Sequence, residues 1–128
     1  MRGKLLGALL LGLLVGVVAL GKVEALIPEV GYEVKPGAPG YLLLVIPNTY
    51  GVSLNKFGIS LAVEGTVTGA LALQGTGPAV IEGGPMYWVV TLPGAGLAPK
   101  GILLVSVKVP AGTDLKAAVG KIVGYKVS

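Results

Sequence analysis

The stretch KFGISLAVE, residues 56–64, decides the fold class of this 128-residue chain. Phe57, Ile59, Leu61 and Val63 are every second residue, so their side chains fall on one side of an extended strand. Strict alternation of this kind is the pattern of a half-buried β-strand. The same pattern returns along the chain between turns rich in Gly and Pro, which indicates a protein built of short strands.

Seven or eight strands are expected after residue 25, and no segment there keeps a helical period for more than about two turns. Leu103, Val105, Val107 and Val109 are predicted to face inward. One helical turn is expected at residues 114–118. The pattern predicts an all-β fold, an immunoglobulin-like or jelly-roll β-sandwich of 7–8 strands. The expected strands are residues 29–35, 41–46, 56–64, 67–74, 79–82, 86–92, 102–109 and 119–127.

The first 25 residues have the layout of an export signal. Two positive charges precede residues 5–20, which are uncharged and rich in Leu, and Val23 and Ala25 stand where a signal peptidase reads small residues. We therefore expect a signal peptide at 1–25, an N-terminal extension at 26–35, a sandwich domain at 36–128, and a secreted or cell-surface protein. Two alternatives stay open: residues 5–21 could remain as a membrane anchor, or a pilin-type cut after Gly3 could leave a helix.

The composition excludes several kinds of site. The chain has no Cys and no His, so neither a Ser-His-Asp triad nor an ordinary zinc site can be built. Residues 26–128 hold seven Lys and five acidic residues, all scattered, which disfavours nucleic-acid binding and a calcium site. Glu29 and Glu33 share the exposed face of one strand and are expected to be solvated. We predict no catalytic residue, no metal and no cofactor. The scarcity of Asn and Gln favours a thermophile.

Several turn motifs resemble those of immunoglobulin-like domains in archaeal and bacterial surface proteins. They are Lys35-Pro36-Gly37, Val109-Pro110-Ala111-Gly112-Thr113 and a last strand that contains Tyr125. A signal, a short N-terminal strand and a single sandwich are also similar in layout to the TasA-like biofilm fibre proteins and to archaeal bundling pilins. That resemblance implies assembly by donor-strand complementation. The candidate donor residues are Leu26, Pro28, Val30, Tyr32 and Val34, and pairing of this strand within its own sandwich stays an equal alternative.

The apolar strands predict assembly. Residues 41–46 have no polar alternation, and residues 26–128 carry only 12 charged side chains, fewer than one small domain normally has. The sequence therefore predicts a non-enzymatic subunit of an extracellular filament, pilus or surface layer, with copies of itself as partner. The alternatives are a membrane-anchored accessory domain of an envelope complex and a pilin with an N-terminal core helix. A carbohydrate-binding module ranks last, because it needs an exposed Trp88 and that residue shares a phase with the apolar Met86 and Val90.

Overall fold

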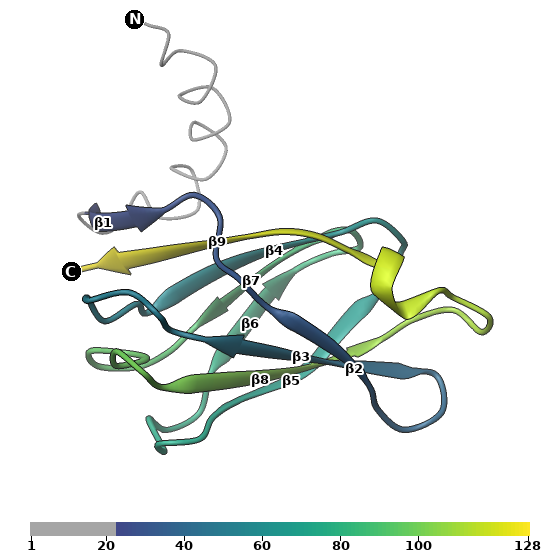
Figure 1. Cartoon of the computed structure of the whole chain (residues 1–128), viewed down its shortest axis with the longest axis horizontal. Coiled ribbons are helices and arrows are strands. Elements are labelled where there is room, and N and C mark those ends of the chain that lie inside the picture. The colour runs from purple at the N-terminus through teal and green to yellow at the C-terminus, as the bar shows by residue number, and fades with distance from the viewer. Residues whose placement is uncertain (1–22) are drawn as a thin grey trace, which may run out of the picture.

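The computed structural model describes residues 23–128, and they form two antiparallel sheets that face each other (Figure 1). The all-β sandwich predicted from the alternation is confirmed, with nine strands rather than seven or eight in this part of the chain. Residues 1–22 lie outside the described residues, and so do most of the expected signal segment, the possible anchor at 5–21 and the pilin-type cut after Gly3. Across residues 23–128, no helix is both long and apolar enough to span a bilayer.

The strands divide into a five-stranded sheet, in the order β1-β9-β4-β7-β6, and a four-stranded sheet, in the order β2-β3-β8-β5. A single 3-10 turn, η1 (Leu115–Ala117), precedes β9, and the side chain of Asp114 caps its first turn. The expected turn at residues 114–118 is therefore confirmed. The strand bounds are β1 Val23–Ile27, β2 Glu33–Pro36, β3 Tyr41–Pro47, β4 Lys56–Leu61, β5 Thr66–Ala72, β6 Val80–Gly83, β7 Tyr87–Thr91, β8 Ile102–Lys108 and β9 Val119–Val127.

The core lies between the two sheets. On β8 the predicted inward residues are buried, with Leu103, Val105 and Val107 each 0% exposed, and on β4 Phe57 and Ile59 are equally buried. Each of these side chains belongs to an alternating set, so one face of every strand enters the core and the other face is left outside. The two sheets therefore share one apolar interior, whose other fully buried members include Leu42, Leu44, Ile46, Leu54, Val90, Leu97 and Ile122.

Two strands change phase within their length. In β5 the register with β8 shifts between Val67 and Gly69, so Val67 faces the core while Leu71 and Leu73 point out, although both lie an even number of residues after Val67. In β9 the register with β4 shifts between Ile59 and Leu61 on β4. Val119 faces the core, but Val123, Tyr125 and Val127 lie on the outer face. A two-residue alternation maintained through residues 67–74 and 119–127 would put these side chains on the core side. It is broken because one extra residue moves every later side chain to the opposite face.

The N-terminal segment is not one strand. Leu26 and Ile27 pair with Tyr125 and Gly124 of β9, in the five-stranded sheet, whereas Val34 pairs with Leu44 of β3, in the four-stranded sheet. The chain crosses from one sheet to the other between residues 28 and 32. The expected strand at 29–35 is therefore reduced to β2, and the segment occupies its own sandwich, which is the alternative the sequence had left open.

The asparagine side chain at the end of β3 holds two loops together. Asn48 is 1% exposed; its amide nitrogen donates to the carbonyl oxygens of Val52 and Leu97, both at 2.9 Å, and its amide oxygen accepts from the Tyr50 nitrogen at 3.0 Å. The single Asn48 side chain thus pairs with three backbone groups, which belong to two different loops.

Asn48→Ala is expected to lower the free energy of unfolding by about 2–4 kcal/mol, because it leaves buried backbone groups unpaired. The measurement is equilibrium denaturation in guanidinium chloride. Thr49→Ala, at the exposed neighbouring residue, serves as the control and should change stability little. Equal midpoints for the two variants would show that the loops do not depend on Asn48.

Candidate binding surfaces

Across β3, β8 and β5, the outer face of the four-stranded sheet is apolar and open, and the exposed Glu33 and Lys35 of β2 lie beside it. Val45 of β3, Leu104 of β8 and Leu71 of β5 stand side by side across three strands. Leu71 is 58% exposed and Leu73, which follows β5, is 57% exposed. We call this surface the aliphatic face; its residues are Leu43, Val45, Leu71, Leu73, Ile102 and Leu104, of which those on β3 and β8 are half-buried.

Polar side chains gather at one end of the aliphatic face. Tyr41 of β3, Lys108 of β8 and Thr66 of β5 form the last row across the three strands. One row inward, the hydroxyl of Thr68 donates to the hydroxyl of Ser106 at 3.2 Å. The sheet therefore presents an apolar area that is followed, along the strands, by one aromatic ring and several hydrogen-bonding groups.

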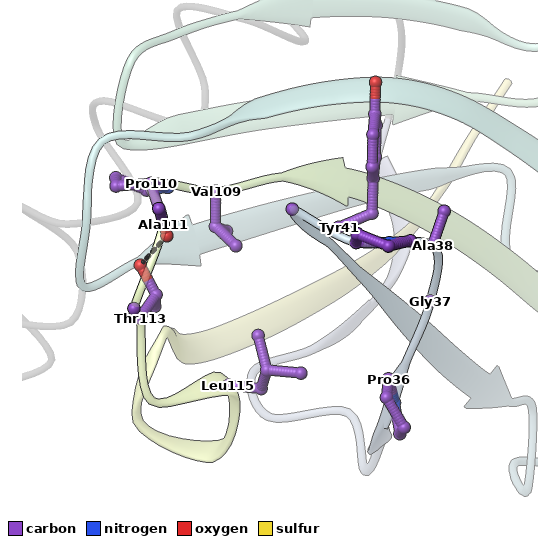
Figure 2. A pocket seen from close by; sticks show the side chains of 12 residues that line it. Pro36, Gly37, Ala38, Tyr41, Val109, Pro110, Ala111, Thr113 and Leu115 are labelled. Atoms are coloured by element: carbon purple, nitrogen blue, oxygen red, sulfur yellow. Dashed lines mark hydrogen bonds between the residues drawn. The ribbon is translucent and has the colours of Figure 1, made fainter.

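A shallow hollow opens beside this polar end (Figure 2). It has a volume of about 370 Å³ and is lined by residues 36–41 and 109–113 and by Leu115, without a charged side chain. The hydroxyl of Thr113 donates to the carbonyl oxygen of Pro110 at 2.6 Å and is thus already used within the loop. A second hollow, of about 360 Å³, adjoins it at Val109 and Pro110 and is lined by Glu64 and Lys108 among others. Prolines, glycines and backbone dominate these hollows, so the open sheet face is the more specific candidate surface.

The outer face of the five-stranded sheet is apolar too, but it is closed to solvent. Val89, Val123 and Tyr125 are 5%, 7% and 3% exposed, although each points away from the core. Tyr87 of β7 lies with its hydroxyl directly over Gly58 of β4, where a methyl group would collide with it. We call this surface the tyrosine face and define it by Leu26, Tyr87, Val89, Val123, Tyr125 and Val127.

The two tyrosine hydroxyls of this face approach each other without a well-formed hydrogen bond, and neither has another partner among the described residues. Burial raises the pKa of Tyr87, partly offset by its contact with Tyr125. Burial also raises the pKa of Tyr125, and the neighbouring Tyr87 adds to the rise. The tyrosine face therefore keeps both phenols neutral in the folded protein.

The structure places the other predicted site residues as parts of the scaffold. Val30 is in the core, and its backbone nitrogen donates to the carbonyl oxygen of Ile122 at 2.7 Å. The hydroxyl of Tyr32 donates to the carbonyl oxygen of Gly120 at 2.8 Å. Val34 packs on the core, Leu26 belongs to the tyrosine face of the five-stranded sheet, and Pro28 is exposed. The candidate donor residues thus do not share one face. Val23 and Ala25, the expected cleavage residues, lie within β1 and pair with Val127 and Lys126 of β9.

The remaining aromatic candidate, Trp88, faces inward as its phase predicts. It packs against the core, and its ring nitrogen donates to the carbonyl oxygens of Gly65 at 3.2 Å and Pro85 at 3.3 Å. An atom added at Gly84 would touch its ring. Trp88 is therefore a half-buried structural residue rather than an open platform.

The acidic residues do not form a metal site. No group of three or more His, Cys, Asp or Glu able to hold a metal ion occurs within residues 23–128. Glu29, Glu33, Glu64 and Glu82 are all exposed, and Glu33 pairs with Lys35 across 3.6 Å. Nothing in the described part of the chain brings two carboxylates together for acid–base work.

The close contact at Gly58 leads to a testable expectation. Gly58→Ala should destabilise the protein by about 1–3 kcal/mol, because the added methyl forces the Tyr87 hydroxyl from its place. Gly69→Ala is the matched control, since that strand glycine has nothing within 4 Å of an added Cβ, and it should change stability little. Introducing Tyr87→Phe together with Gly58→Ala should restore part of the loss in thermal denaturation. Equal effects of the two glycine substitutions would show that Tyr87 does not lie over Gly58.

The two raised tyrosine pKa values give a dependence on alkaline pH. Above about pH 10 the unfolded chain loses phenolic protons that the folded chain retains, so stability is present below that pH and falls as the pH rises further. The measurement is urea denaturation at a series of pH values. A chain with both Tyr87→Phe and Tyr125→Phe should show a shallower decline; an identical decline would assign the effect to other groups.

No protein-family model matches the chain, and no curated protein is similar to it in sequence. Among solved structures, it is similar to the chitin-binding domain of a hyperthermophilic chitinase from Pyrococcus furiosus. A solution structure gives a TM-score of 0.50 at 19% identity and covers 80% of this chain and 95% of that domain. A crystal structure of a chitin-binding domain of chitinase from the same organism gives 0.49 at 16% identity, with 81% and 100% covered.

The first of these structures corrects the expected function. The sequence predicted a filament, pilus or surface-layer subunit and ranked carbohydrate binding last, but the similar solved domain is named for binding chitin. Within the chain, β1 and β2 pair with β9 and β3 rather than standing free. The apolar excess on which the prediction rested is present, but it lies on the two outer sheet faces, and its presence does not identify a copy of the chain as the partner.

Proposed function

We propose that this protein is a non-catalytic, exported module that adheres to an insoluble β-linked polysaccharide, with chitin as the first candidate. The observation that carries the proposal is the aliphatic face, an open apolar surface that spans three adjacent strands. The fold likeness to a chitin-binding domain supports the same conclusion.

An open apolar sheet face suits a polysaccharide surface better than a single dissolved sugar. Soluble ligands are normally held in concave pockets that enclose most of their area, and the two hollows beside this face are open to solvent. Packed polysaccharide chains instead offer a plane of ring C–H groups. Leu71 and Leu104 could cover such a plane and be removed from water by it.

The polar end of the face would orient a bound polysaccharide chain through hydrogen bonds. Tyr41 offers an aromatic ring with a hydroxyl, Lys108 an ammonium donor, and Ser106 and Thr68 hydroxyls. Hydroxyl and acetamide groups of a chitin chain can form hydrogen bonds with donors and acceptors of this kind. The aliphatic part of the face contributes apolar contact area, which does not fix the orientation of the chain. An ordered contact with a polysaccharide needs both parts.

The proposal includes no chemical step. The described carboxylates are exposed and dispersed, and binding through an open face requires no proton transfer. Such a module acts by keeping the protein, and anything joined to it, bound to the insoluble polysaccharide.

The test is depletion of the purified protein from solution by insoluble chitin, measured as bound protein against free protein. Leu71→Asp should weaken binding about fivefold or more, because a carboxylate pressed against an apolar surface loses its hydration. Since Leu71 is 58% exposed, the substitution should leave the fold intact.

Val80→Asp is the matched control, because Val80 is 55% exposed but lies on β6 of the other sheet. It should bind chitin as the unchanged protein does. Failure of the unchanged protein to bind chitin would reject the proposed ligand, and equal loss in both variants would reject the proposed face.

A further inference from the structure

We infer that the second hollow, beside the polar end of the aliphatic face, is a subsite for the acetamido group of a sugar residue, with Glu64 and Lys108 as its hydrogen-bonding partners. The inference rests on the proposed polysaccharide binding and names the chemical group that the protein distinguishes. It makes this pair the residues that separate chitin from cellulose, whose sugar residues carry a hydroxyl group in place of the acetamido group.

The hollow and the aliphatic face share residues. Lys108 and Thr66, which pair with each other in the last row of the sheet, also line the hollow. Leu104 lies four residues before Lys108 on the same side of β8, and an extended strand covers about 13 Å over that distance. A polysaccharide chain that lies along β8 on the aliphatic face therefore reaches the hollow where the strand ends.

The connection from β4 to β5 brings Glu64 to the end of β8. Gly65 lies so close to that end that an added Cβ would be 3.0 Å from the carbonyl oxygen of Lys108. The backbone nitrogen of Gly65 donates to the carbonyl oxygen of Pro85 at 3.1 Å, and its carbonyl oxygen accepts from the ring nitrogen of Trp88 at 3.2 Å. Glu64 therefore stands beside a backbone that is already fixed, so little backbone freedom is lost when a ligand binds.

Both charged groups of the hollow are without a partner inside the protein. Within residues 23–128, neither Glu64 nor Lys108 forms an ion pair or a side-chain hydrogen bond. Both side chains are exposed, and both line the same hollow. A carboxylate, which only accepts hydrogen bonds, and an ammonium group, which only donates them, are therefore available together to one ligand.

An acetamido group has three parts, and the hollow offers a partner for each. The carboxylate of Glu64 can accept from its N–H group, and the ammonium group of Lys108 can donate to its carbonyl oxygen. Its methyl group needs an apolar contact, which the exposed Pro85 and Pro110 provide. The hydroxyl group of cellulose has no methyl group for the prolines, and its single oxygen would have to serve both charged partners.

Binding isotherms of the purified protein on two solids, insoluble chitin and microcrystalline cellulose, test the inference. Lys108→Met removes the donor and keeps most of the side chain, and Glu64→Leu removes the acceptor. The matched controls are Lys121→Met on β9 and Glu82→Leu on β6, because they change exposed residues of the same types in the other sheet.

The unchanged protein should bind chitin about fivefold or more tightly than cellulose. Lys108→Met and Glu64→Leu should each weaken binding to chitin about fivefold, because each removes a charged hydrogen-bonding partner, and should leave binding to cellulose nearly unchanged. Both controls should keep the preference for chitin. Thermal denaturation checks that each variant is folded, and either variant carries the test by itself if the other does not fold.

The outcomes separate this inference from the proposed function. A protein that does not bind chitin would reject both. Binding to chitin that is weakened by Leu71→Asp, but by neither Lys108→Met nor Glu64→Leu, would overturn the acetamido subsite alone. Equal weakening on chitin and on cellulose would overturn it too, since the pair would then be a general polar contact. So would equal losses in Lys108→Met and Lys121→Met, which would assign the effect to net charge.

Discussion

The structure depends on the burial of the inner faces of β3, β8, β4 and β9 against each other. Leu44, Val105, Phe57 and Ile122 meet in that layer, and each is fully buried. The hydrophobic effect is proportional to apolar area removed from water, so the paired central strands supply most of the driving force. The loops, the edge strands and both outer faces are held in place because this layer holds the two sheets together.

Once the inner faces are occupied, the remaining apolar residues can only lie outside. In most small sandwiches the outer faces are polar. Here each sheet carries apolar residues on both sides, so the molecule has two apolar outer surfaces, which differ in solvent exposure. The aliphatic face is open along β5, whereas the tyrosine face is closed. That asymmetry separates an open apolar surface from one whose side chains are shielded from solvent.

Local details support the division. Gly58 gives the Tyr87 hydroxyl a place on the sheet that any other residue would block, so the tyrosine face is shaped by a glycine as well as by its aromatic rings. The polar row of Tyr41, Lys108 and Thr66 arises because β3, β8 and β5 pair in register at that end. Neither arrangement involves neighbours in the sequence, and both need the ladder pairing to bring the residues together.

Alternation in the sequence was enough to predict the class of fold, the positions of most strands and the inward set on β4 and β8, because a two-residue period has one structural meaning when it recurs between turns. It could not predict the register shifts in β5 and β9, since one extra residue leaves the local pattern intact while reversing every later side chain. Those shifts put Leu71, Leu73, Val123 and Tyr125 outside. The sequence by itself therefore determined that this chain has more apolar strand than a sandwich can bury. Only the tertiary structure decided on which faces the excess lies, because strand pairing, not local pattern, sets the side to which each residue points.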